Sequence, residues 1–378
     1  MVTLKNLTIY TEDKVIKNGY ITFDKTILKI GEGDVNGEDM GGKILIPGFI
    51  DQHIHGVKGY DIMDASHEAL DAFCKYLPKE GTTAYYATTM TASKEAIINA
   101  LNAVATYDAQ GKIGAELLGV HLEGPFISEI YKGAQNKEHI QAVSFQLMDE
   151  FIKASNNTIK HITLAPELKD SEAFINYLTN QNIVVSIGHS DASEDDVKNA
   201  LNQGALCFTH AFNAMRQLHH RDIGVVGMML SDSSSYAELI ADMIHVNPSA
   251  MKLLYQVKTS DKLILITDAM RAKQLSSGNY DLGGQSVTVK NNQARLKDGT
   301  LAGSVLEFID GVKNIQKSLE LSINELIKMA SLNPAKLHNI DHKKGSIKLN
   351  KDADLLVIDH DFNIHRTYTL GKKAYQLD

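Results

Sequence analysis

Six side chains able to bind a metal ion or move a proton stand at the ends of short apolar runs in the sequence. They are His53, His55, Glu123, His189, His210 and Asp268. Imidazole nitrogens and carboxylate oxygens suit zinc, iron and other divalent cations, and the lack of thiolates argues against a closed structural site. Each residue alone has a structural explanation, such as a cap or a salt bridge. Six of them at the ends of five runs favour one shared metal centre.

His53 and His55 are separated by one residue in the segment PGFIDQHIHG. Alternate residues of a strand point to the same face, so both imidazoles can reach one ion. Glu123 ends the run GVHLEG, and an acidic group there must be solvated, paired or metal-bound. His121 shares the face of Glu123 but lies deeper, which predicts a packed or supporting histidine.

The apolar runs that carry these residues alternate with helical patterns. The runs occupy residues 43–51, 82–89, 115–124, 160–167, 182–190, 205–212, 236–245 and 262–269. Segments between them, such as 93–107 and 193–204, begin with a serine followed by acidic residues, which suits the first turn of a helix. The alternation predicts an α/β fold, a (β/α)8 TIM-type barrel of parallel strands. The active site of such a barrel lies at the carboxyl ends of its strands.

Both ends of the chain have a different pattern, in which short apolar runs alternate with turn signals. We predict one small β-sandwich domain formed by residues 1–43 and 336–378, and a barrel domain of residues 44–335. Within the barrel domain, residues 280–304 predict an inserted β-hairpin and residues 322–337 a closing helix.

Composition restricts the expected partners and the compartment. A formal net charge of -8 over 378 residues disfavours nucleic acid and anionic membranes as partners, so an anionic substrate must be held by local cations. The two cysteines, Cys74 and Cys207, lie in apolar stretches and give no support to a disulfide framework. The charged N-terminal segment and the lack of a long apolar run predict a cytoplasmic protein.

The motifs PGFIDQHIHG, HLEGPF, GHS, THAFNAM and LITDA, in this order, resemble those of the amidohydrolase superfamily along nearly the whole chain. The resemblance implies a barrel beside a small domain built from both termini. It implies that His53 and His55 bind one divalent ion and that His189 and His210 bind a second. Glu123 matches the bridging carboxylate, and Asp268 matches the catalytic acid/base. The implied cofactor is one or two divalent ions per subunit, zinc or iron.

Within that superfamily the motifs resemble those of enzymes that deacetylate phosphorylated amino sugars. The implied reaction is hydrolysis of the acetamide of N-acetylglucosamine 6-phosphate to glucosamine 6-phosphate and acetate. The implied substrate-binding positions are Ala134, Gln135, Asn213, Ala214, Arg221, His245, Leu301, Ala302 and Gly303. Arg221 and its neighbour His220 are expected to bind the phosphate, because a guanidinium presents paired donors to phosphate oxygens. The resemblance also implies a homodimer whose partner subunit contributes to phosphate binding.

Gln135 departs from the pattern of many relatives, which have at this position a histidine that polarises the substrate carbonyl. An amide can still donate a hydrogen bond to an oxyanion. The alternatives are a deacetylase for the galactosamine epimer, a dihydroorotase-like enzyme and an N-acyl amino acid hydrolase. A non-catalytic scaffold is a further alternative, but such proteins usually lose metal ligands, whereas all six positions are filled here.

Overall fold

A barrel of eight parallel strands forms the centre of the computed structural model, which describes residues 1–377. The strands are β6 (Phe49–Ile54), β9 (Thr82–Thr88), β10 (Glu116–Glu123), β11 (Ile159–Leu164), β12 (Val184–Ile187), β13 (Cys207–Phe208), β14 (Tyr236–Ile240) and β15 (Leu263–Ile266). Each pairs in parallel with the next along the chain. Five of them, β6, β9, β12, β13 and β15, are buried over their whole length, which explains the continuous apolar runs.

The first and last barrel strands are joined by individual hydrogen bonds. The backbone N–H of Asp268 donates to the carbonyl of His53 over 2.8 Å. The hydroxyl of Thr267 donates to the carboxylate of Asp51 over 2.6 Å. The predicted (β/α)8 barrel is thereby confirmed, and two predicted site residues meet where it closes.

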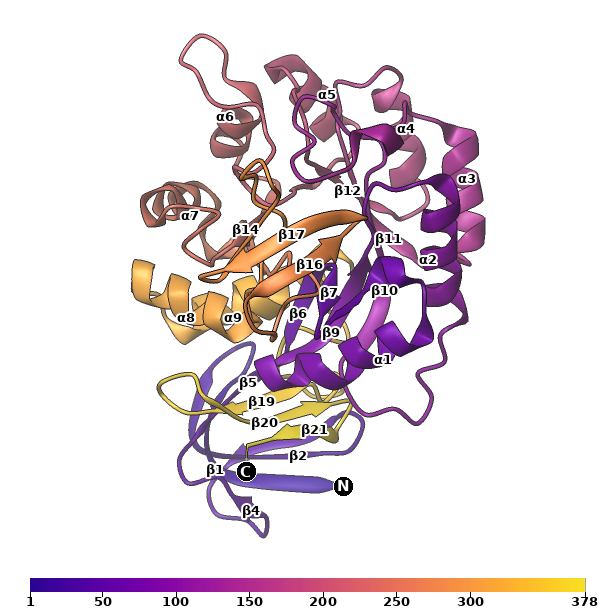
Figure 1. The fold of residues 1–378 in the computed structure, drawn as a ribbon. Coiled ribbons are helices and arrows are strands. Elements are labelled where there is room, and N and C mark those ends of the chain that lie inside the picture. The colour runs from indigo at the N-terminus through magenta and orange to yellow at the C-terminus, as the bar shows by residue number, and fades with distance from the viewer. Residues whose placement is uncertain (378) are drawn as a thin grey trace.

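One helix follows each barrel strand, and the helices surround the barrel (Figure 1). They are α1 (His67–Tyr76), α2 (Lys94–Thr106), α3 (Phe145–Ala154), α4 (Ser171–Thr179), α5 (Glu194–Asn202), α6 (Gly224–Ser231), α7 (Pro248–Lys262) and α8 (Phe308–Leu319). The two helix starts predicted from serine are confirmed, because Ser93 accepts a hydrogen bond from the N–H of Ala96 and Ser193 forms a capping box with Asp196.

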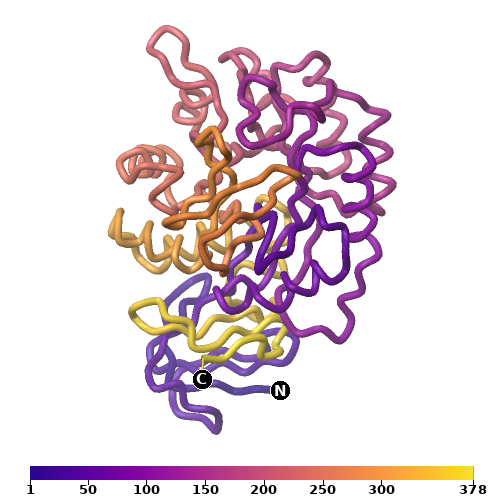
Figure 2. The backbone as a smooth tube through the Cα atoms, viewed as in Figure 1, coloured from indigo at the N-terminus to yellow at the C-terminus, as the bar shows by residue number. Residues whose placement is uncertain are grey.

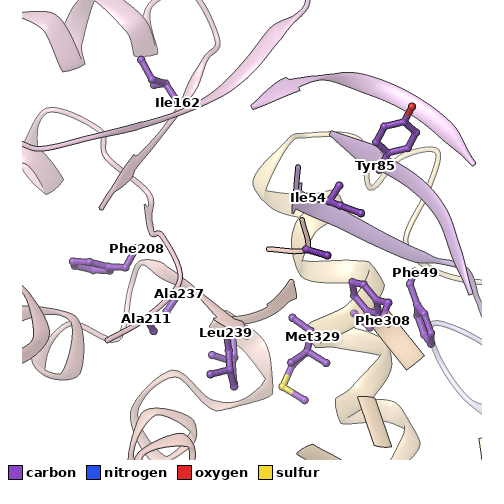
Figure 3. Packing of buried hydrophobic residues seen from close by; sticks show 14 of the residues in the cluster. Phe49, Ile54, Tyr85, Ile162, Phe208, Ala211, Ala237, Leu239, Phe308 and Met329 are labelled. Carbon is purple, nitrogen blue, oxygen red and sulfur yellow. The ribbon is translucent and has the colours of Figure 1, made fainter. Parts of the chain in front are cut away.

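The main core lies between the strands and the surrounding helices. Phe49 of β6 stacks on Phe308 of α8 with ring centroids 5.0 Å apart. Figure 3 shows this pair among buried side chains from distant parts of the chain, from Tyr85 to Met329. Burial of each large apolar side chain stabilises the fold by about 1.5–3 kcal/mol. This packing gives the residues at the strand ends a rigid support.

The two ends of the chain meet in a second, mostly antiparallel sheet next to the barrel (Figures 1 and 2). Its strands are β1 (Val2–Tyr10), β2 (Val15–Phe23), β3 (Ile27–Glu32), β4 (Glu38–Asp39), β5 (Ile44–Pro47), β19 (Leu355–Ile358), β20 (Ile364–Thr369) and β21 (Lys372–Gln376). The antiparallel pair β5–β19 joins the N-terminal strands to the C-terminal ones. Leu4, Phe23 and Leu355 belong to a separate core within this sheet. The predicted small unit built from both termini is confirmed.

The predicted run at residues 43–51 is divided between the two sheets, since β5 pairs with β1 and β19 whereas β6 pairs with β9. The chain passes between the sheets at Gly48, where a Cβ atom would lie 2.2 Å from the hydroxyl of Thr83. We propose that the small domain extends through β5, beyond the boundary predicted at residue 43, and is completed by residues 336–378.

Two other segments are more complex than predicted. The insertion has three strands, β16 (Gly278–Leu282), β17 (Gln285–Lys290) and β18 (Gln293–Arg295), in place of a hairpin. The closing helix is divided into α9 (Ile323–Ile327), a π-helical turn (Lys328–Leu332) and α10 (Asn333–Leu337). Pro334 has no N–H, so a regular helical ladder cannot run through it. A short hairpin of β7 (Gly56–Val57) and β8 (Tyr60–Asp61) follows β6 directly.

Candidate metal centre

Three of the six predicted residues lie two positions beyond the end of a barrel strand, on backbone in the left-handed region. The φ angles are 49° at His189, 29° at His210 and 48° at Asp268. For residues other than glycine, such conformations cost on the order of 1–3 kcal/mol and persist where the surrounding structure imposes them, commonly at functional sites. The three turns therefore indicate a site that is built at the expense of local stability.

Glu123, at the end of β10, is the centre of the cluster and contacts four histidines. Its Oε1 lies 3.3 Å from Nε2 of His53, 3.3 Å from Nε2 of His189 and 3.2 Å from Nε2 of His210. Its Oε2 lies 3.4 Å from Nε2 of His55. A carboxylate among four imidazoles supplies oxygen and nitrogen donors of the kind that bind divalent cations.

Asp268 completes one side of the cluster. Its Oδ1 lies 3.2 Å from Nε2 of His55 and 3.6 Å from Nε2 of His53. On the other side, the Nε2 atoms of His189 and His210 lie 3.1 Å apart. The donor atoms thus form two groups, each within 4.8 Å: His53, His55 and Asp268, and Glu123, His189 and His210.

The outer nitrogens of two histidines fix which nitrogen faces the cluster. Nδ1 of His55 lies 3.2 Å from the carbonyl of Thr88, and Nδ1 of His189 lies 3.0 Å from the carbonyl of Tyr131. A carbonyl only accepts, so in each case Nδ1 carries a hydrogen, and Nε2 is the nitrogen that can bind a metal once it is deprotonated. Nε2 of His53 is buried and makes no hydrogen bond. These donors fit a divalent cation.

The electrostatics of the cluster also favour a cation. Burial lowers the pKa of His55, but hydrogen bonds to Asp268 and Glu123 outweigh it and raise the pKa to about 10. Burial raises the pKa of Glu123, but the neighbouring histidines, His53 first, hold it well below its ordinary value. The carboxylates therefore stay ionised and stabilise positive charge between them.

His121 is excluded from the ligand set by its hydrogen bonds. Its Nδ1 donates to the carbonyl of Gln52 over 3.1 Å, and its Nε2 lies 2.8 Å from the hydroxyl of Thr163. Burial lowers the pKa of His121 to about 3. This environment agrees with the predicted packed or supporting histidine.

A cavity of about 180 Å³ opens above the cluster. Most of the predicted substrate positions line it, together with five of the six metal-centre residues. The predicted substrate positions among its lining residues are Ala134, Gln135, Asn213, Ala214, His245, Leu301 and Gly303. Ala302 is fully buried beside them in the small apolar core of the insertion.

Arg221 and His220 do not line this cavity. Both are exposed on the turn that closes between His219 and Asp222, and Nη1 of Arg221 lies 2.6 Å from Nε2 of His220. Among the described residues, the cavity wall contains no lysine or arginine. The chain by itself thus does not bring the predicted phosphate-binding pair to the cavity.

Gln135 is fixed by two hydrogen bonds. Its Oε1 accepts from the N–H of Thr91 over 2.8 Å, and its Nε2 donates to Oε2 of Glu123 over 2.6 Å. An amide nitrogen has two hydrogens, so one of them is committed to the central carboxylate. The side chain supports Glu123 as well as lining the cavity.

Two carboxylates near the site were not singled out from the sequence. Glu238 of β14 accepts from Nδ1 of His53 over 3.0 Å. Asp242, just after β14, accepts from Nδ1 of His245 over 2.6 Å. Both lie in the predicted run 236–245, where a carboxylate inside an apolar segment needs a buried partner. The presence of Glu238 and Asp242 inside an apolar run is the sequence feature that could have identified them.

A model described as the amidohydrolase family matches residues 44–374. The chain belongs to this family. Amidohydrolases depend on metal ions, and the buried groups around Glu123 are able to hold them. No helix within residues 1–377 combines the length and the apolar character needed to cross a bilayer.

Individual relatives of this amidohydrolase cover almost all of it. It is 41% identical over 383 residues to the N-acetylglucosamine-6-phosphate deacetylase of Bacillus subtilis, covering 98% of this chain and 96% of the relative. The crystal structure of the enzyme of that name from Thermotoga maritima superimposes with a TM-score of 0.91 at 33% identity, covering 100% of both chains. A Mycobacterium smegmatis relative, an aspartate-to-alanine variant in complex with N-acetyl-D-glucosamine-6-phosphate, gives a TM-score of 0.93 at 26% identity over 99% of both chains.

Proposed function

We propose that this amidohydrolase cleaves the acetamide of N-acetyl-D-glucosamine 6-phosphate, yielding D-glucosamine 6-phosphate and acetate. The observation that carries the proposal is the arrangement of Glu123 among four histidines at the base of a cavity. The near full-length similarity to deacetylases of this substrate supports the choice among amide hydrolyses.

The proposed metal ligands are His53, His55, Glu123, His189 and His210, which would hold one or two ions, zinc or iron. A divalent cation bound there would lower the pKa of water to about 7 and would polarise an amide carbonyl. The protein contributes the histidine Nε2 atoms and the Glu123 carboxylate that lies among them. Burial of these side chains keeps bulk water away from the reacting groups.

Asp268 is the proposed acid/base. Its carboxylate lines the cavity and contacts both His53 and His55, so it lies beside the point where water must be deprotonated. Burial raises the pKa of Asp268, but the charge of His53 and the hydrogen bond to His55 lower it below its ordinary value. The ionised carboxylate accepts the proton of the attacking water and later donates it to the departing amine.

His245 is proposed to bind the substrate through Nε2, because Asp242 fixes its Nδ1. The N–H groups of Ile244 and His245 donate to the other oxygen of Asp242, both over 2.8 Å. These bonds hold the Asp242 side chain against His245.

An Asp242→Asn variant replaces the charged acceptor that holds Nδ1 of His245 by a neutral amide. We expect KM to rise about tenfold, with a smaller change in kcat and no change in metal content. Steady-state kinetics with metal analysis measure this, and an unchanged KM contradicts the role of His245.

The phosphate is proposed to be bound by Arg221 and His220 of a second subunit in a homodimer. Two features support this arrangement: the cavity wall has no lysine or arginine among its described residues, and Arg221 is exposed on a short turn. Asp222 at the base of that turn forms an ion pair with Arg216, which holds the turn outward.

A cytoplasmic location is also proposed, since both cysteines are free and buried and suit a reducing compartment.

Acetate release tests the proposed reaction. The substrates are N-acetylglucosamine 6-phosphate, its galactosamine epimer and free N-acetylglucosamine, with enzyme of measured metal content. We expect the phosphorylated gluco substrate to have the highest kcat/KM and free N-acetylglucosamine to be a poor substrate. Preference for the galacto epimer would change the substrate assignment. No acetate from any phosphorylated sugar, with metal present, would refute the proposed function.

A further inference from the structure

Glu238 is a fully buried carboxylate that does not line the cavity. It lies in the middle of β14, and its Oε2 is within hydrogen-bonding distance of two separate parts of the metal centre. Nδ1 of His53 lies 3.0 Å away and the N–H of His210 lies 3.2 Å away. The other oxygen, Oε1, accepts from Nε2 of Gln52 over 2.7 Å. One side chain thus connects β6, β14 and the turn after β13.

These contacts favour the ionised form of Glu238. Gln52 and the backbone N–H of His210 both donate to it, and hydrogen bonds donated to a carboxylate stabilise its charged form. Nδ1 of His53 must then be the donor in its bond to Oε2. The Nε2 lone pair of His53 is consequently directed at Glu123 and Asp268, where it lies 3.3 Å and 3.6 Å from their oxygens.

The contact with His210 acts on the opposite half of the centre. His210 has φ 29°, a conformation that is held only by its surroundings. Its own N–H donates to Oε2 of Glu238, and the N–H of Ala211 donates to the backbone carbonyl of Glu238 over 2.8 Å. These two bonds fix the turn whose imidazole contacts Glu123 and His189.

Charge gives a second reason. Two divalent ions in the cluster would carry four positive charges, whereas the proposed site includes only two carboxylates, Glu123 and Asp268. Glu238, directly behind His53, adds a third negative charge. Among the described residues, no lysine or arginine lies within hydrogen-bonding distance to neutralise it. A carboxylate behind a ligating histidine raises the basicity of that ligand.

We infer that Glu238 is a positioning residue that couples the two halves of the metal centre, orienting His53 on one side and the turn of His210 on the other. The inference rests on the proposed function, since it takes the histidine cluster to be a metal site. Loss of the charge of Glu238 would weaken metal binding by the cluster, and more so at His53, whose side chain it contacts directly. Replacement of such supporting partners typically costs about 10–100-fold in metal affinity.

The test is zinc binding by the full-length chain after removal of metal with a chelator. Calorimetric titration with Zn²⁺ compares the wild type with Glu238→Gln, which keeps the shape and removes the charge. We expect the His53 side to lose about 10–100-fold in affinity and the His210 side to lose less. Glu238→Asp retains the charge, so its affinity for zinc should lie between the two. Absorption spectra of the Co²⁺ forms report whether the ligand geometry has changed.

Asp242→Asn is the matched control. Asp242 lies just after β14 and, like Glu238, accepts from a histidine Nδ1 and from a histidine backbone N–H. In Asp242 both donors belong to His245, which is outside the metal cluster. Its zinc affinity should equal that of the wild type. Equal zinc affinities of Glu238→Gln and the wild type, or an equal loss in both amide variants, overturn the inference.

The Glu238→Asp variant keeps the inference testable if Glu238→Gln does not fold. If Glu238→Gln is insoluble, Glu238→Asp decides, and wild-type zinc affinity in that variant overturns the inference. Wild-type protein that binds no zinc counts against the proposed metal site itself. Normal zinc binding and acetate release in both the wild type and Glu238→Gln leave the proposed function intact and reject the role of Glu238 alone.

Discussion

Asp268→Asn should retain its metal ions and lose most of its turnover. An amide has nearly the same shape as the carboxylate but cannot accept the proton of the attacking water, and general acid–base groups contribute about 10²–10⁴-fold to rate. Because Asp268 contacts His53 and His55 at 3.6 and 3.2 Å, a modest fall in metal affinity is expected as well. Rates must therefore be measured with saturating metal, beside metal analysis of each sample.

The expected defect is in kcat, with KM for the phosphorylated sugar little changed, because the carboxylate acts on the proton and not on the sugar. An Asp268→Asn enzyme with full metal content and near wild-type kcat would rule out the acid/base role. Loss of metal in parallel with activity would instead make Asp268 a ligand first. The two results are distinguished by the same pair of measurements.

The barrel was predictable because its strands are buried on both faces. In the sequence such strands appear as continuous apolar runs, as in the segments that form β9 and β15. Each run is followed by the pattern of an amphipathic helix. The metal centre was predictable for a related reason. In a barrel the strand ends converge, so a polar residue at the end of an apolar run, such as Glu123 or Asp268, is placed by the topology alone.

The parts that could not be predicted depend on long-range contacts. The left-handed turns at His189 and His210 contradict the local preference of histidine, and tertiary packing imposes them. Glu238 could be flagged as a buried charge, but its partner His53 is in another strand far earlier in the sequence. The same holds for the division of residues 43–51 at Gly48, which depends on how closely Thr83 approaches.

The sequence also does not tell in which subunit Arg221 binds the phosphate. The spacing between THAFNAM and Arg221 is compatible with the cavity of the same chain and with that of a second chain. In the structure the turn from His219 to Asp222 is exposed and Arg221 contacts His220. The structure of one chain therefore gives the position of Arg221 but does not identify the subunit whose substrate it binds. Mutant kinetics in mixed dimers supply that missing information.

Arg221→Ala should lower kcat/KM for the phosphorylated sugar by about 10²–10³-fold, because loss of one partner of a hydrogen-bonded charge pair costs roughly 3–4 kcal/mol. The defect should appear mainly in KM, and activity on free N-acetylglucosamine should not change, since that sugar has no phosphate. Arg221→Lys should recover part of the loss as a point charge. Equal defects on both sugars would contradict a phosphate contact.

Mixing Arg221→Ala with Asp268→Asn then tells whether the arginine acts within its own chain or across a dimer. In a mixed dimer of two-fold symmetry, one cavity combines an intact Asp268 with an intact Arg221 from the partner, and the other cavity lacks both. If the arginine acts across the interface, co-expression of the two variants restores acetate release that neither has alone. If it acts within its own chain, every cavity still lacks one of the two groups and activity stays low. Size-exclusion chromatography of the mixture confirms that dimers are present, and a monomeric wild type with full activity would reject the shared site because one chain alone leaves Arg221 outside the cavity wall.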